Sequence, residues 1–173
     1  MGKVLPSLTE LVAQVESDRH EGKRIVFTNG CFDVLHLGHV RLLQVAKQQG
    51  DILVVAVNGD DYVRQTKGEG RPVFPELERK EILAALQAVD YVVGFYEERS
   101  ANLILRIRPH VFVKGADYET VLHPSEREAA EQVGAAIVFV PLIPDRSSSK
   151  IVARVKSGSE GKGNPMPAVK KAP

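Results

Sequence analysis

Two histidines three residues apart, His36 and His39, flank Gly38 in the segment TNGCFDVLHLGH at residues 28–39. The segment follows a short apolar run and precedes a helix-like stretch, so both imidazoles stand where a helix is expected to begin. The first N–H groups of a helix have no intrahelical partner, and the helix dipole favours negative charge there. Imidazole N–H groups and free backbone amides would converge on one anion, and a polyphosphate suits that arrangement.

Other chemistries for the histidine pair need groups that the sequence does not supply nearby. Zinc takes three or four nitrogen or sulfur ligands, and Cys31 is the only further one close by. Hydrolase-type base catalysis would need a carboxylate at triad spacing and a G-x-S-x-G turn, and neither occurs. The G-x-G-x-x-G and G-x-x-x-x-G-K-[ST] motifs are absent as well. Phosphate binding is the preferred interpretation, and metal ligation by the pair is the minor alternative.

Two further segments carry cations that bind phosphate. Lys67 lies in the stretch 58–75, which is rich in glycine and which we expect to be a long, mobile loop. Two interpretations of Lys67 are open: its ammonium group binds a polyphosphate when the loop closes, or the residue is an ordinary solvated lysine. Arg146 precedes three serines at residues 147–149, where the last amphipathic stretch starts. These groups suit a second phosphate clamp, although serines at a helix start are also ordinary N-cap residues.

Apolar runs alternate with helix-like stretches, and this alternation must position the groups named above. The pattern Ser7-x-x-Glu10 predicts a capped amphipathic helix near the N-terminus. Strands that alternate with helices are joined by crossovers into a parallel sheet. The sequence therefore predicts an α/β fold: one Rossmann-like domain with a doubly wound, five-stranded parallel sheet and an N-terminal helix. Ligands of such sheets bind beyond the carboxyl ends of the strands. The expected strands are 24–28, 52–57, 91–93, 111–113 and 136–140, and the helices after them are 38–48, 76–89, 101–107, 125–133 and 149–156.

Composition and charge narrow the class of protein. In 173 residues, 23 Lys and Arg face 22 Asp and Glu, so no whole-protein field would attract nucleic acid or a membrane surface. One cysteine excludes an internal disulfide, and the N-terminus lacks the layout of a signal peptide, so we expect a cytoplasmic protein. The longest apolar run, 52–57, is too short to span a membrane. We expect a domain over 1–156 and a disordered, apolar-poor tail over 157–173.

These motifs together carry a family resemblance. GCFD at 30–33 followed by HLGH at 36–39 resembles the G-x-F-D-x-x-H-x-G-H signature of the nucleotidyltransferase superfamily, which includes the cytidylyltransferases. The later landmarks are similar to those of the D-glycero-β-D-manno-heptose 1-phosphate adenylyltransferases, over about residues 5–156. In the last landmark, serine stands where those relatives usually have two threonines. The landmarks are KG at 67–68, RP at 71–72, ER at 78–79, VKGADY at 113–118 and RSSS at 146–149.

The resemblance implies transfer of AMP from ATP to a heptose 1-phosphate, with release of pyrophosphate and formation of ADP-heptose for surface glycans such as lipopolysaccharide core. A phosphate monoester is largely dianionic at pH 7, so it would attack the α-phosphorus directly, without a general base. Two alternatives remain at this point. One is a sibling enzyme that uses CTP and an alcohol phosphate such as glycerol 3-phosphate; the other is a catalytically silent nucleotide-binding module.

The resemblance also implies roles for individual residues. Asp33 is interpreted as a turn-stabilising carboxylate rather than a metal ligand, and Arg79 either binds substrate or forms a surface ion pair beside Glu78. Mg²⁺ would come with ATP and be held by its phosphates. Because such relatives are commonly dimers, a homodimer is expected to be possible for this chain as well. The implied catalytic residues are His36, His39 and Lys67; the nucleotide-binding residues are Cys31, Phe32, His36, Gly38, His39, Arg146, Ser147, Ser148 and Ser149; the acceptor-binding residues are Asn58, Asp60, Arg79, Lys114, Gly115 and Asp117.

Overall fold

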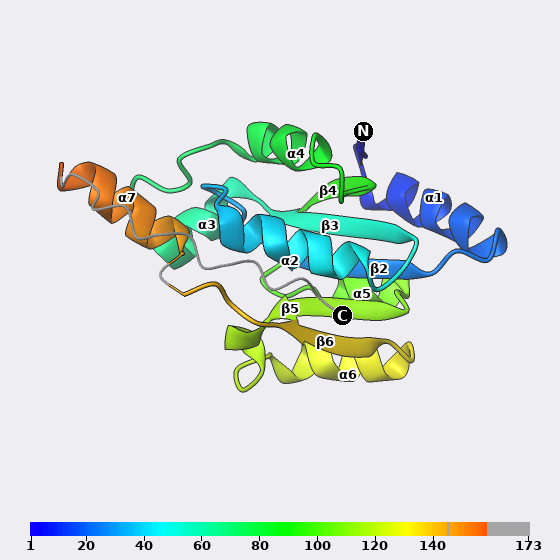
Figure 1. Ribbon diagram of the computed structural model, residues 1–173. Helices are drawn as coiled ribbons and strands as arrows, with labels where there is room; N and C mark the ends of the chain where they lie inside the picture. The colour runs from blue at the N-terminus through cyan, green and yellow to red at the C-terminus, as the bar shows by residue number, and fades with distance from the viewer. Residues whose placement is uncertain (145, 159–173) are drawn as a thin grey trace.

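The computed structural model describes residues 1–144 and 146–158, which form an α/β fold around a six-stranded sheet (Figure 1). All strand pairs are parallel. The predicted tail lies outside the described residues from position 159 onward. In the order of the sheet, the strands are β1 (Lys3–Val4), β4 (Tyr91–Phe95), β3 (Ile52–Asn58), β2 (Ile25–Gly30), β5 (Val111–Gly115) and β6 (Ala136–Val140).

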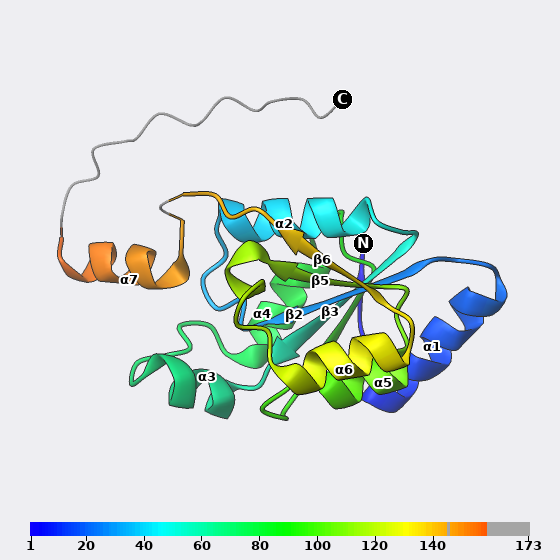
Figure 2. The ribbon, with the colours of Figure 1, turned by 90° about the horizontal axis from the view of Figure 1, so that it is seen from below.

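The helices cover both faces of the sheet. Figure 2 shows α2 on one face and α1, α5 and α6 on the other, and α4 packs on the same face as α2. Among the described residues, no helix has the length and apolar character needed to cross a lipid bilayer. The helices are α1 (Leu8–His20), α2 (Leu37–Lys47), α3 (Asp60–Lys67), α4 (Glu76–Ala84), α5 (Ala101–Ile107), α6 (Pro124–Gln132) and α7 (Ser148–Lys156), with a 3₁₀ turn at Ala116–Tyr118.

The hydrophobic core has two layers because side chains of a strand alternate between its faces. In β3, Val54 and Ala56 pack toward α1, α5 and α6, whereas Leu53, Val55 and Val57 pack toward α2 and α4. Every residue of β3 is buried. Burial on both faces explains why residues 52–57 of this strand are uniformly apolar rather than alternating.

The predicted fold class is confirmed, with corrections to its details. The sheet has six strands rather than five, since the two residues of β1 add an edge strand next to β4, and β1 also precedes the expected N-terminal helix. That helix, α1, starts as predicted, with the Ser7 hydroxyl accepting the Glu10 N–H. The helix expected over 76–89 ends at Ala84. A two-residue strand carries no pattern that sequence periodicity can detect.

The stretch 58–75 was expected to be one long loop, and this is wrong. It contains α3, whose only buried residue is Val63. α3 has eight residues, of which only the adjacent Tyr62 and Val63 are apolar, so the apolar repeat at i, i+3 and i+4 that reveals the other helices is missing.

The order of the strands places the ligand-binding edge. From β2 the chain proceeds outward through β3 to β4, and then crosses to the other side of β2 to form β5 and β6. The direction of winding therefore reverses between β2 and β5. The carboxyl ends of these two strands flank the crevice where α/β sheets of this kind bind ligands. Figures 1 and 2 show α3 and α7 at this end of the molecule.

Candidate active site

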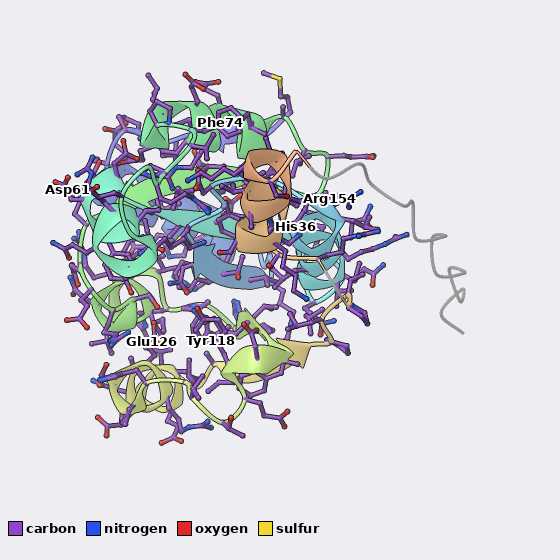
Figure 3. The ribbon with its side chains drawn as sticks, turned by 90° about the vertical axis from the view of Figure 1, so that its left-hand side faces the viewer. His36, Asp61, Phe74, Tyr118, Glu126 and Arg154 are labelled. Atoms are coloured by element: carbon purple, nitrogen blue, oxygen red, sulfur yellow. The ribbon has the colours of Figure 1, made fainter. Side chains whose placement is uncertain are left out.

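A cleft of about 310 Å³ lies at the carboxyl ends of β2 and β5. Four segments line it: the turn from β2 into α2, the end of α3, the end of β5 with the following 3₁₀ turn, and the chain that leads into α7. Figure 3 faces this edge, with His36 toward α7 and Tyr118 on the α6 side. His36, Gly38, His39 and Lys67 all line the cleft, so the structure brings the predicted catalytic groups together.

His36 is the N-cap residue of α2, and its own helix fixes its tautomer. Its Nδ1 atom accepts a hydrogen bond of 3.1 Å from the Gly38 N–H, so the proton of the neutral ring resides on Nε2. Burial lowers the pKa of His36, and the charges of Lys67 and Arg146 lower it further. A side chain at residue 38 would collide with this ring, since a Cβ there would lie 2.9 Å from two of its atoms.

His39 stacks on His36, with ring centroids 3.8 Å apart, and tilts against Phe32 at 5.3 Å. Burial lowers the pKa of His39 to about 3, helped by the neighbouring His36 and Lys67. Its Nδ1 atom is buried and has no hydrogen-bond partner in the described part of the chain. Both histidines are therefore largely neutral near pH 7, and in that form each ring offers one N–H donor and carries no positive charge.

The backbone N–H groups at the start of α2 were expected to be free, but those of Gly38 and His39 are hydrogen-bonded within the chain. The Gly38 N–H is taken by His36 Nδ1, and the His39 N–H donates to the His36 carbonyl at 2.9 Å. The amides of these two residues are thus not free for an anion, as the sequence had suggested. The histidine N-cap itself satisfies them, which leaves the imidazoles as the donors at this end of α2.

Asp33 anchors the loop that precedes α4. Its buried carboxylate pairs with Arg71 at 2.5 Å and accepts the N–H groups of Val73 and Phe74 at 2.6 and 3.1 Å. These contacts confirm the interpretation of Asp33 as a turn-stabilising group. Phe32, just before it, adopts a left-handed conformation with φ of 47°, so the chain turns sharply between β2 and α2.

Arg79 is not a surface residue, and the expected exposed ion pair beside Glu78 is wrong. Its side chain is fully buried and donates to the carbonyls of Phe74, Cys31 and Asn58 and to the carboxylate of Asp60. Neither Arg79 nor Asp60 lines the clefts at this edge. The guanidinium instead ties the ends of β2 and β3 to α3 and α4.

Lys67 lies in a helix rather than in the expected loop. It is the last residue of α3, its exposed side chain lines the cleft, and Gly68 with φ of 87° ends the helix after it. Both interpretations of Lys67, phosphate ligand and solvated lysine, stay predictions.

A second cleft, of about 210 Å³, adjoins the first. Lys67, Lys114 and Tyr118 line both, so the two clefts meet at a cationic junction. Lys114 is buried; its Nζ donates to Asn29 at 3.1 Å and lies 4.2 Å from the centre of the Tyr118 ring. Burial lowers the pKa of Lys114, against the opposing effect of the charges of Glu126 and Asp117.

Comparison with known proteins agrees with this geometry. A family model described as "Cytidylyltransferase-like" matches residues 27–154. The chain belongs to the cytidylyltransferase-like family. The matched range begins in β2 and ends in α7, so it contains both clefts and the segments that line them.

Curated relatives of this family member include proteins named "Bifunctional protein HldE". The one from Alcanivorax borkumensis is 44% identical over 155 residues, and the one from Pelobacter propionicus is 46% identical over 145 residues. These matches cover 90% and 84% of this chain, but 32% and 30% of the relatives. The chain thus spans about a third of the length of the curated relatives that it matches.

Solved structures include similar folds. The lipopolysaccharide core biosynthesis protein from Thermoplasma volcanium is 28% identical with a TM-score of 0.58, over 70% of this chain and 98% of that one. Pantothenate synthetase from Thermus thermophilus aligns over 89% of this chain and 70% of that one, with a TM-score of 0.63 at 17% identity. The second likeness concerns the fold alone.

In this family member, the three serines at the start of α7 make different contacts. The Ser147 hydroxyl caps α7 by accepting the Lys150 N–H, and the buried Ser148 hydroxyl donates to the Val34 carbonyl at 2.9 Å. Ser149 is exposed, and all three serines line the larger cleft with Arg146. The N-cap interpretation is confirmed for Ser147. The second phosphate clamp stays a prediction, for which Arg146 and the exposed Ser149 are the groups without these structural hydrogen bonds.

Of the six predicted acceptor residues, four line the clefts, whereas Asp60 and Arg79 line neither. Asn58 lines the smaller cleft, Gly115 and Asp117 line the larger one, and Lys114 lines both. Cys31 also lines both, and its thiol lies 3.7 Å from the Asn58 amide oxygen, with its pKa raised by burial. Sequence reasoning gave no role to several residues of the smaller cleft, because no motif marks them: Tyr62, Thr66, Glu98, Arg99 and Glu126.

Proposed function

We propose that the chain is a nucleotidyltransferase that transfers AMP from ATP to D-glycero-β-D-manno-heptose 1-phosphate, giving ADP-heptose and pyrophosphate. The observation that best supports this proposal is the pair of adjoining clefts, which meet at Lys67 and Lys114. A transfer between two phosphorylated substrates needs two binding places that join where the phosphates react. The relatives named HldE and the lipopolysaccharide core protein support a sugar phosphate as acceptor.

In this proposal the larger cleft takes ATP and the smaller one takes the acceptor. An oxygen of the acceptor phosphate attacks the α-phosphorus, the bond from the α-phosphorus to the bridging oxygen breaks, and pyrophosphate leaves with that oxygen. The dianionic acceptor needs no general base. Neutral histidines are consistent with this, since their task is to donate N–H groups to phosphate oxygens as negative charge moves onto the leaving group.

The cations complete the electrostatic part of the proposal. Lys67 at the end of α3 and Arg146 before α7 reach the larger cleft from opposite elements, which suits the two ends of a triphosphate. In the described residues, no group of three His, Cys, Asp or Glu side chains could hold a metal ion. In this proposal Mg²⁺ enters with ATP, bound to its phosphates as part of that substrate.

One assay tests the proposal: pyrophosphate release from each of the four NTPs with heptose 1-phosphate, glycerol 3-phosphate or phosphopantetheine as acceptor. We expect turnover with ATP and heptose 1-phosphate. Turnover confined to CTP and glycerol 3-phosphate would replace the proposed reaction by that of a cytidylyltransferase. Binding of ATP without turnover on any acceptor would reject an enzymatic role for these substrates.

A further inference from the structure

The lining of the smaller cleft separates into two groups. The residues that it shares with the larger cleft, among them Lys67 and Lys114, mark the place where the two phosphates meet. The residues found only in the smaller cleft must then face the rest of the acceptor. This division rests on the proposed function. The residues exclusive to the smaller cleft are Asn58, Tyr62, Thr66, Glu98, Arg99 and Glu126.

Glu126 is the buried acid of this group. It is the third residue of α6, and its exposed fraction is 5%. Figure 3 shows Glu126 and Tyr118 at the same side of this edge, near α6. One carboxylate oxygen, Oε1, accepts the N–H of Ser100 at 3.1 Å and its hydroxyl at 2.6 Å. The other oxygen, Oε2, has no hydrogen-bond partner in the part of the chain that the structure describes.

The geometry points to Glu126 as a specificity-determining residue that accepts hydrogen bonds from hydroxyl groups of the acceptor sugar through Oε2. Carboxylates repel phosphate but accept from hydroxyls, and such charge-assisted bonds are among the stronger ones in proteins. Glu98, Tyr62 and the Asn58 amide add further polar groups beside it. A neutral, polyhydroxylated body attached to a phosphate fits this lining, because the phosphate meets the lysines and the hydroxyls meet the acids.

Glu126 also has a structural contact, which the test must separate from a role in specificity. Its bonds to Ser100 join the start of α5 to α6. Ser100 lines neither cleft. Ser100→Ala removes the hydroxyl bond to Oε1 and a long contact of 3.4 Å with Asn29, and it leaves Oε2 in place. Glu126→Gln keeps an oxygen for Ser100 and replaces the free oxygen by an amide donor. Glu128→Gln, at an exposed position of the same helix, is the control matched for charge.

The experiment measures pyrophosphate release against heptose 1-phosphate at saturating ATP and Mg²⁺, together with direct ATP binding by calorimetry. We expect Glu126→Gln to raise KM for heptose 1-phosphate about tenfold or more, the effect of losing one hydrogen bond to a charged group. ATP affinity should stay unchanged in that variant. Ser100→Ala and Glu128→Gln should leave KM for the acceptor unchanged.

Monodeoxy analogues of heptose 1-phosphate identify the hydroxyl. In the wild-type enzyme, at least one analogue should lose about tenfold in kcat/KM, and Glu126→Gln should no longer distinguish it from the parent sugar, as a double-mutant cycle requires. The wild-type comparison stands even if Glu126→Gln fails to fold: equal kcat/KM for every analogue would overturn the inference.

The outcomes also separate this inference from the proposed function. An active wild-type enzyme whose Glu126→Gln variant keeps its acceptor KM would overturn the role of Glu126 alone, and so would an equal rise in Ser100→Ala. A wild-type enzyme that used no sugar 1-phosphate would overturn the proposed function and this inference with it.

Discussion

Acid should destabilise the protein through His39 specifically. Folding lowers the pKa of His39 from 6.5 to about 3, so between these two pH values the unfolded chain binds the proton and the folded one does not. Stability then rises with pH through that window and is lost as the pH falls below 6.5. At pH 5, about 1.5 pH units below the unfolded pKa, the loss from this one group is about 2 kcal/mol, at about 1.36 kcal/mol per unit.

Urea unfolding of the wild type and of His39→Gln, measured from pH 5 to pH 7.5, isolates this contribution. Other titrating groups act on both proteins, so the difference between the two unfolding free energies reports on residue 39. The wild type should lose about 2 kcal/mol more than the variant between pH 7.5 and pH 5. The m-values should match, since a change in m would indicate a different unfolded or folded state.

Parallel pH profiles for the two proteins would refute the reasoning. They would mean that folding leaves the pKa of His39 at its ordinary value, so that burial of the ring does not disfavour its charged form. His39 would then take up its proton just below neutral pH, and its assignment as a neutral donor would not hold in mild acid.

Three further variants test the site. His39→Ala should lower kcat by about 10²-fold or more, the usual effect of removing one transition-state donor; a change confined to KM would contradict this. Lys67→Ala should lower kcat with little change in ATP affinity by calorimetry, and arginine should rescue it poorly because a planar fork does not replace a point charge; an unchanged kcat would make Lys67 a solvated lysine. Arg79→Met should lower the free energy of unfolding by about 3–5 kcal/mol in a urea titration, since it strands buried carbonyls, whereas Arg64→Ala, from an exposed ion pair, should cost less than about 1 kcal/mol; equal losses would show that burial of Arg79 contributes nothing.

Features that depend only on residues close together in the chain, such as single strands and helix caps, could be predicted from the sequence. The apolar run at β3 needs only its own residues to indicate a strand covered on both faces. The Ser7 cap and the histidines at the start of α2 are likewise matters of a few consecutive residues. Even so, the first histidine occupies the backbone amides that sequence reasoning had left free for a ligand.

The sequence by itself determined the class of fold and the edge of the sheet at which the larger cleft lies. Strand–helix alternation dictates a parallel sheet, and the first turn of such a sheet lies at its binding edge. Only the tertiary structure decided that Arg79 is buried and that Glu126 from α6 shares a cleft with Lys67 from α3. These residues lie far apart in the chain and in no common motif. Their meeting depends on how whole helices pack on the sheet, which no local pattern of residues encodes.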